Sequence, residues 1–218
     1  MILSLYRLAT SIGAPLISMY LKKRLKRGKE DATRFNERLG RPEIERPEGH
    51  LIWMHGASVG ESLSMLPVIA EIVSRANAPS VLVTTGTVTS ARLMRERLPE
   101  GAIHQFVPVD SLPYVLNFLD HWKPNVALWW ESELWPNLIT ETHHQNIPMI
   151  LVNARMSPPS FKRWQRWKRF AQLLLGSFDL VLAQSDTDVS RFEALGAKHV
   201  ERMGNMKFAV PPLPCDEG

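Results

Sequence analysis

From residue 50 onward, short apolar runs alternate with longer segments whose apolar residues recur at helical spacing. The runs have the length of strands and are bounded by turn residues. They lie at 51–54, 81–85, 103–108, 126–130, 149–153 and 180–184. The segments between them predict helices at 61–75, 88–98, 111–121, 134–145, 158–175 and 186–195. This alternation predicts an α/β domain over residues 50–210, with a parallel sheet and helices on both faces.

The first thirty residues have a different pattern. Residues 2–21 are mostly apolar with one charge, Arg7, and the basic cluster KKRLKRGK follows at 22–29. A cleavable signal peptide has its basic residues before the apolar stretch, so this order argues against one. The segment would suit a membrane span that keeps the body in the cytoplasm, or a helix lying in the lipid headgroups. A helix packed on the domain is the third interpretation. We expect a membrane anchor at 1–30 and a connecting segment at 31–49.

The charge of the chain is unevenly distributed. The net charge is +4, yet the first 29 residues hold seven basic residues and no acidic one. The rest has 19 basic and 22 acidic residues, a net charge of −3, which argues against nucleic-acid binding by bulk charge. The single cysteine, Cys215, excludes a disulfide framework and a cysteine-based zinc site.

The loop HGASVGES, residues 55–62, joins the first predicted strand to a helix. Its small residues would let a ligand approach the backbone, and free N–H groups at a helix start favour anions. The loop matches neither a phosphate-binding Walker A motif nor GxGxxG, which argues against a dinucleotide-dependent oxidoreductase. Glu61 would suit a general base beside this open loop. The alternative is that Glu61 only stabilises the helix start.

Two further loops at predicted strand ends carry charged residues. In ESELWP, residues 131–136, Glu131 and Glu133 would bind sugar hydroxyls, hold a basic side chain or cap the next helix. Without a histidine-rich partner set they make a weak metal site. In NARMS, residues 153–157, Arg155 would clamp a phosphate or carboxylate, or pair with a nearby acid such as one of the two glutamates.

Residues 161–170, FKRWQRWKRF, predict one basic, tryptophan-rich helix. Trp164 and Trp167 would share a side with Ala171 and Leu174, with the basic residues elsewhere. Such a helix could dock on anionic lipid, hold RNA, or cover the core with a solvated basic face. Among the histidines, His55 lies at the mouth of the first loop, where we expect it to form hydrogen bonds rather than bind metal.

Four motifs together resemble the Kdo (3-deoxy-D-manno-octulosonic acid) transferases of lipopolysaccharide synthesis. HGASVGES, ESELWPNLI, NARMS and GNMKF (204–208) occur here in that order, and the resemblance covers nearly the whole chain. It implies the Rossmann-like acceptor-side domain of a GT-B glycosyltransferase. The implied reaction transfers Kdo from CMP-Kdo to a lipid A precursor with inversion, without a cofactor or bound metal, on the cytoplasmic face of the inner membrane. The implied partners are these two substrates and membrane lipids, with no nucleic acid.

The resemblance also implies roles for individual residues. Glu61 corresponds to the family's general base, and Glu131 to a functionally important glutamate. Ser58, Gly60, Glu133, Arg155, Asn205 and Lys207 match family positions that we assign provisionally to substrate binding or active-site support. The chain ends soon after GNMKF, so residues 211–218 read as a linker or a truncated end. We expect this chain to be inactive without a donor domain; the alternative is a non-catalytic, membrane-bound module that binds lipid A precursor.

Overall fold

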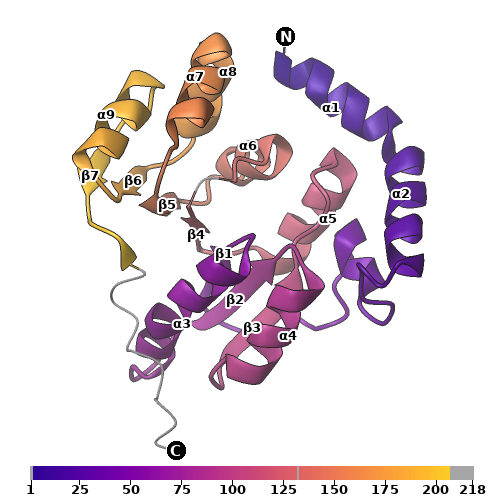
Figure 1. Ribbon diagram of the computed structural model, residues 1–218. Coiled ribbons are helices and arrows are strands. Elements are labelled where there is room, and N and C mark those ends of the chain that lie inside the picture. Colours follow the sequence, from indigo (N-terminus) through magenta and orange to yellow (C-terminus); the bar gives the residue numbers. More distant parts are fainter. Residues whose placement is uncertain (1, 132, 207–218) are drawn as a thin grey trace, which may run out of the picture.

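The computed structural model describes residues 2–131 and 133–206, and within them a parallel sheet lies between two layers of helices (Figure 1). The strands are β1 (Leu51–His55), β2 (Ser80–Thr85), β3 (Ala102–Phe106), β4 (Val126–Trp130), β5 (Met149–Ala154), β6 (Leu180–Ala183) and β7 (Val200–Arg202). The α-helices are α1 (Ile2–Ile12), α2 (Ala14–Lys26), α3 (Val59–Val73), α4 (Val88–Arg97), α5 (Leu112–Trp122), α6 (Pro136–His144), α7 (Pro158–Arg166), α8 (Lys168–Leu175) and α9 (Asp186–Ala194). A 3-10 helix, η1 (Phe35–Leu39), precedes β1.

The strand order is β3-β2-β1-β4-β5-β6-β7, and every pair is parallel. The predicted Rossmann-like α/β fold and its six predicted strands are confirmed. Strand β7 was not predicted, because Val200 is followed by Glu201 and Arg202 and so forms no apolar run. The chain moves outward from β1 in both directions, which places a topological switch point between β1 and β4. Ligands of such sheets bind beyond the carboxyl ends of the strands at this point.

The two faces of the sheet bury different helices. Met65 and Ile69 of α3 and Met94 of α4 pack on one face, against Met54 and its neighbours. Helices α5, α6, α8 and α9 bury their apolar residues on the other face, where Trp53 lies. Trp53 and Met54 are adjacent in β1, so the alternation of side chains along one strand feeds both layers.

The basic, tryptophan-rich segment is two helices rather than the predicted one. The backbone leaves helical geometry at Trp167, with φ −116° and ψ 36°, which separates α7 from α8. Ala171 and Leu174 are buried and Trp164 packs at the edge of the core, as expected. Trp167 is 55% exposed, so the prediction that it shares one side with Ala171 and Leu174 is wrong. The break at Trp167 turns its side chain away from the stripe that a continuous helix would have formed.

The apolar N-terminal segment forms two helices with a bend of 60° between α1 and α2. Gly13 lies at the bend and Pro15 follows in the first turn of α2. Proline cannot donate the hydrogen bond that would continue α1, so the helix breaks there. Among the described residues, no single helix is long and apolar enough to cross a membrane. The bent pair passes the same criterion by length and composition alone.

Helix α1 turns its polar side toward the domain. The Tyr6 hydroxyl donates to Asp110 Oδ2 at 2.8 Å, Arg7 forms an ion pair with Glu141, and Asn137 donates to the Thr10 hydroxyl at 3.2 Å. Leu21 is buried, whereas seven large apolar or aromatic residues of the two helices are exposed: Ile2, Leu5, Leu8, Ile12, Leu16, Met19 and Tyr20. We call this set the apolar face of the arm, the arm being α1 and α2. A helix of an ordinary soluble domain shows the opposite arrangement.

Side chains of the connecting segment cover the open edge of the sheet at β3. Glu37 of η1 accepts a hydrogen bond from Phe106 N at 2.7 Å, and Arg34 donates to the His104 carbonyl at 2.7 Å. These bonds satisfy backbone groups that an edge strand would otherwise leave open. The segment therefore fixes the base of the arm beside the carboxyl end of β3.

Candidate active site

Glu61 is held at the start of α3 by the loop that leaves β1. Ser58 is the N-cap residue, and its hydroxyl accepts from Glu61 N at 3.2 Å. The same hydroxyl lies 2.7 Å from Glu61 Oε1, while Ala57 N donates to Glu61 Oε2 at 2.7 Å. The Glu61 residue is only 7% exposed. Glu61 therefore does stabilise the start of α3, as one interpretation expected. The same contacts hold its nearly buried carboxylate at the carboxyl end of the sheet.

Gly56 packs closely against the start of α3. A Cβ atom built on Gly56 would lie 2.8 Å from Met65 Cε and 3.3 Å from Glu61 Cβ. Any larger residue would therefore push against the first turns of α3. Gly60, the other glycine of the predicted set, is exposed within the first turn of α3.

The loop after β4 brings Glu131 and Glu133 to the neighbouring strand end. Glu131 is 8% exposed, has a left-handed backbone (φ 60°), and donates from its N–H to the Val152 carbonyl at 2.9 Å. Left-handed backbone is unfavourable for a residue other than glycine, asparagine or aspartate. Glu133 is exposed and its carbonyl accepts from Trp129 Nε1 at 2.7 Å. Partial burial raises the pKa of the Glu133 carboxyl, and the charge of Glu61 raises it further. The two loops therefore place interacting carboxyl groups at the switch point.

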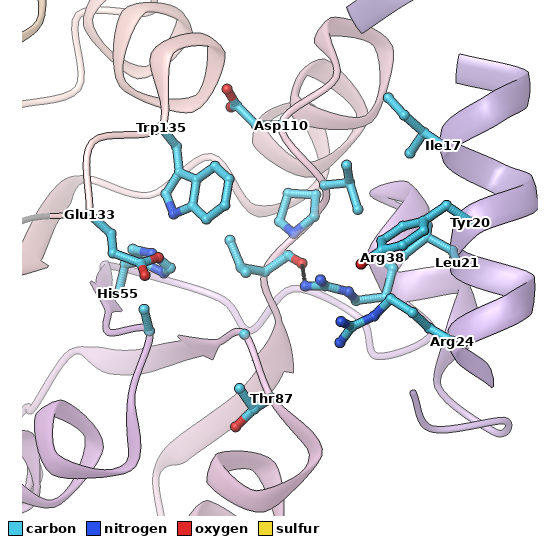
Figure 2. Close-up of a pocket in the computed structure, with 15 residues that line it drawn as sticks. Ile17, Tyr20, Leu21, Arg24, Arg38, His55, Thr87, Asp110, Glu133 and Trp135 are labelled. Atoms are coloured by element: carbon cyan, nitrogen blue, oxygen red, sulfur yellow. Dashed lines mark hydrogen bonds between the residues drawn. The ribbon is translucent and has the colours of Figure 1, made fainter. Parts of the chain in front are cut away.

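A pocket of about 420 Å³ opens between these strand ends and the arm (Figure 2). Its sheet side is lined by residues that include His55, Ala57, Thr87, Asp110, Glu133 and Trp135. Its opposite side is lined by Ile17, Tyr20, Leu21 and Arg24 of α2, with Arg38 of η1. Figure 2 shows Glu133 and Trp135 facing the side chains of α2 across this space. The pocket thus has the Glu133 carboxyl group on its sheet side and the guanidinium groups of Arg24 and Arg38 on its arm side.

His55 lies in the wall of this pocket and is fully buried. Its Nδ1 is 2.9 Å from the Thr84 hydroxyl, which also accepts from Trp53 Nε1 at 2.9 Å. Burial lowers the pKa of His55 to about 3. The imidazole is therefore neutral at physiological pH, and the prediction that His55 forms hydrogen bonds is confirmed.

The other predicted site residues are more dispersed. Arg155 is exposed at the end of β5, and within residues 2–131 and 133–206 it has no ion-pair partner, so the suggested pairing with Glu131 or Glu133 is not formed there. Asn205 precedes Met206, whose N–H donates to Asn153 Oδ1 at 3.1 Å, so this segment returns to the end of β5. Lys207 and the tail 211–218 lie outside the described residues.

Several residues of the pocket carried no signal in the sequence analysis. Asp110 lies in the loop after β3, where a lone aspartate is not distinctive. Its two carboxylate oxygens accept from Tyr6 and from the N–H groups of Asn137 and Leu138. Arg38 lies in the connecting segment, where the sequence has no helical or strand periodicity from which its contacts could be predicted. In the described part of the chain, no group of three or more His, Cys, Asp or Glu is arranged to hold a metal.

Comparison with known sequences places the chain beside one group of enzymes. A family model described as 3-deoxy-D-manno-octulosonic-acid transferase (kdotransferase) matches residues 33–210. A 3-deoxy-D-manno-octulosonic acid transferase from Rickettsia bellii is 38% identical over 98% of this chain and 51% of its own length. A probable mitochondrial 3-deoxy-D-manno-octulosonic acid transferase from Arabidopsis thaliana is 39% identical over 98% of this chain and 49% of its own length. The chain spans about half the length of these curated relatives.

Solved structures support the fold alone. A structure of MnaA from S. aureus with UDP aligns with a TM-score of 0.54 at 15% identity, covering 78% of this chain and 50% of that one. A UDP-GlcNAc 2-epimerase from Neisseria meningitidis, bound to UDP-GlcNAc, aligns with a TM-score of 0.51 at 16% identity over 72% of this chain and 47% of that one. In each case the matched region is about half of a longer chain.

Proposed function

Because the chain belongs to the 3-deoxy-D-manno-octulosonic-acid (Kdo) transferase family, we propose that it provides the acceptor-binding half of an inverting GT-B glycosyltransferase. In this proposal CMP-Kdo is the donor, a lipid A precursor is the acceptor, and the reaction belongs to lipopolysaccharide synthesis. The donor is bound by a second half that completes the cleft. The proposal rests above all on the Glu61 carboxylate, which is nearly buried and fixed at the switch point of the sheet.

Glu61 acts as the general base in this mechanism. The acceptor hydroxyl must lose its proton as its oxygen forms a bond to the anomeric carbon of Kdo, while the bond from that carbon to the CMP phosphate breaks. A carboxylate in a fixed position can accept that proton. Among residues 2–131 and 133–206, each Glu61 oxygen accepts a single hydrogen bond, and a carboxylate oxygen has lone pairs for two. One oxygen therefore retains the capacity to take the proton.

The neighbouring carboxyl groups assist this step. Glu133 lines the pocket and interacts electrostatically with Glu61. Burial and the charge of Glu61 raise the pKa of Glu133, whereas Glu61 is held by Ser58 and Ala57. Glu131 and Arg155 lie at the adjacent strand ends β4 and β5, where the second half of the cleft would approach.

The arm places this site at a membrane in our proposal. The apolar face of the arm points away from the domain, and exposed Lys22, Lys23, Lys26 and Arg27 follow it. An apolar helical face with adjacent cations binds an anionic bilayer surface. Trp167 extends this surface, because Ile2 of α1 shares an apolar hollow with Trp164, Trp167 and Phe170. The cytoplasmic face of the inner membrane is the location that we propose.

A transfer assay with a matched pair of glutamates tests the catalytic proposal. CMP release from CMP-Kdo in the presence of lipid A precursor is measured on the chain joined to the remaining half of a relative. Glu61→Gln should lower the rate by at least about 100-fold, since loss of a general base costs that much. Glu71→Gln changes an exposed glutamate of the same helix and should leave the rate within about twofold.

The outcomes separate an enzyme from a binding module. A folded Glu61→Gln variant that transfers within tenfold of the parent would exclude Glu61 as the base. A joined protein that binds the lipid A precursor without transferring Kdo would leave acceptor binding as the better description. The chain alone, run in parallel, tests our expectation that this half needs its counterpart.

A further inference from the structure

The arm side of the pocket holds two arginines on one carboxylate. Arg24 Nε is 2.6 Å from Glu30 Oε1, and Arg38 Nε is 3.3 Å from Glu30 Oε2. The Glu30 side chain is only 2% exposed, and those of Arg24 and Arg38 are 29% and 12% exposed. Two guanidinium groups and one carboxylate leave this cluster with a net charge of +1. A partly desolvated surplus charge of this kind is stabilised by an anion.

The two arginines are fixed in place before any ligand arrives. Arg24 also donates to the Lys29 carbonyl at 3.3 Å and lies 5.9 Å from the centre of the Tyr20 ring. Arg38 donates from Nη1 to the Val107 carbonyl, at the carboxyl end of β3. Burial lowers the pKa of Arg38, and the charge of Arg24 adds to this effect. Each guanidinium has five N–H donors, so both retain donors beyond these contacts.

Acidic groups of the pocket lie elsewhere or are already engaged. Asp110 accepts hydrogen bonds from Tyr6, Asn137 N and Leu138 N. Glu133 lies across the pocket from α2 in Figure 2, while Arg24 and Arg38 lie on the α2 side. The pocket therefore has the Glu133 carboxyl group on its sheet side and two guanidinium groups, a group type that suits phosphate, on its arm side.

We propose that Arg24 and Arg38 form a binding site for a phosphate group carried by the lipid-linked sugar that enters this pocket. The inference rests on the proposed function, because it takes the sugar acceptor to be the pocket's ligand. The pocket is lined by Ile17, Tyr20 and Leu21 from the same helix whose outer face carries Leu16 and Met19. A ligand bound there would have its acyl chains beside the apolar face of the arm and its hydroxyls toward Glu61. The phosphate site would thus set which end of the sugar reaches the base.

Calorimetric binding to this chain in detergent micelles tests the site. The probes are a tetraacylated glucosamine disaccharide with two phosphates and the same disaccharide after phosphatase treatment. Arg24→Gln should weaken binding of the phosphorylated probe by about tenfold, as expected for loss of a charge-assisted hydrogen bond. The same variant should bind the dephosphorylated probe as the parent does. Lys198→Gln removes the same charge from an exposed residue outside the arm and should change neither affinity by more than twofold.

Two further arms identify the source of the phosphate and guard against misfolding. Arg38→Lys keeps the charge but loses the planar fork, and should weaken only the phosphorylated probe. Phosphatidylglycerol and inorganic phosphate are added as competitors, and neither should displace the disaccharide at equal concentration.

The results that would overturn the inference are distinct from failure of the proposed function. Equal losses for both probes in Arg24→Gln, or equal effects of Arg24→Gln and Lys198→Gln, would exclude a phosphate site. Displacement by phosphatidylglycerol would assign the cluster to bilayer headgroups instead. If the parent chain bound neither disaccharide, the acceptor-binding function itself would be wrong.

Discussion

Ser58 links folding and chemistry through a single hydroxyl group. It accepts the Glu61 N–H and lies within hydrogen-bond distance of the Glu61 carboxylate. The hydroxyl therefore caps α3 and orients the candidate base at the same time. Ser58 is therefore a positioning residue. Its substitution should affect both the stability of the domain and the rate of transfer, and the two effects can be measured separately.

We expect Ser58→Ala to lower the free energy of unfolding by about 1 kcal/mol, the usual cost of losing an N-cap. It should also lower the transfer rate of the joined enzyme by about tenfold and shift its pH profile, since Glu61 loses a hydrogen-bond donor. Ser157→Ala is the control, because Ser157 caps α7 in the same way, accepting from Ser160 N. Urea denaturation and CMP-release rates measure the two effects.

The control decides what Ser58 does. Ser157→Ala should cost similar stability and leave transfer unchanged. If both variants lost transfer in proportion to stability, Ser58 would have a capping role only.

At the residue level, the sequence indicated the strand-end glutamates well and the arm side of the pocket poorly. Glu61 and Glu133 were predictable because each follows a recognisable strand and loop. Arg38 was not predictable, because it contacts Glu30, Arg24 and Val107. No helical or strand periodicity in the sequence links these positions. Its position depends on the tertiary course of residues 27–50.

At the scale of elements, the arm reverses the usual arrangement of an amphipathic helix. Tyr6, Arg7 and Thr10 face the domain. Exposed leucines and isoleucines such as Leu8 and Ile12 lie on the opposite side. The sequence suggested an apolar helix but not which side would be buried. Tyr6 and Arg7 face the domain because they bind Asp110 and Glu141, and the sequence does not show that these residues are neighbours.

We expect the double substitution Ile12→Glu and Leu16→Glu to weaken binding to vesicles containing phosphatidylglycerol by about 100-fold or more. Both side chains are about 70% exposed, at 71% and 69%, so the change should leave folding intact. Burying two such side chains in lipid contributes about 3 kcal/mol or more. Vesicle co-sedimentation measures the affinity.

Ile44→Glu is the matched control, since Ile44 is an exposed apolar residue outside the arm. Its variant should sediment with vesicles like the parent. Equal binding by the double variant and the parent would refute the arm as the membrane-docking surface.

Another element shows where periodicity fails. Residues 158–175 kept a helical pattern of apolar positions, and most of the segment is helical. The junction at Trp167 has no glycine or proline to mark it. Helix α8 instead follows the core through Ala171 and Leu174 while α7 contacts it through Phe161 and Trp164, so packing rather than local preference sets the break.

At the scale of the whole molecule, the alternation of strands and helices was enough to predict the sheet and its layers. The strand order needed the structure, because apolar runs carry no information on which strands are neighbours. That order brings the loops after β1 and β4 together and so creates the site. The short strand β7 extends the sheet at its far edge without altering the site.

Buried neutral histidines should make this fold sensitive to acid. Burial lowers the pKa of His55 from 6.5 to about 3. Between pH 6.5 and pH 3, His55 is therefore protonated in the unfolded chain and neutral in the native state. Stability is therefore complete above pH 6.5 and decreases as the pH falls toward 3, by about 1.4 kcal/mol per pH unit for this group. Burial lowers the pKa of His104 to about 3 as well.

Urea denaturation at pH 7 and pH 5 measures this dependence. Relative to the parent, His55→Gln should lose about 2 kcal/mol less stability between the two pH values. His143→Gln, at an exposed position, should follow the parent. An unchanged pH dependence in both His55→Gln and His104→Gln would show that the histidines are not held neutral.

The left-handed backbone at Glu131 has a consequence for engineering this domain. Glycine at that position would remove a conformational penalty of about 1 kcal/mol and would also remove the carboxylate. A library screened only for heat resistance would thus enrich the substitution that erases a residue beside the base. Thermostabilised versions intended for synthesis of lipid-linked sugars should hold position 131 constant and seek their gains on the far ends of α3 and α5.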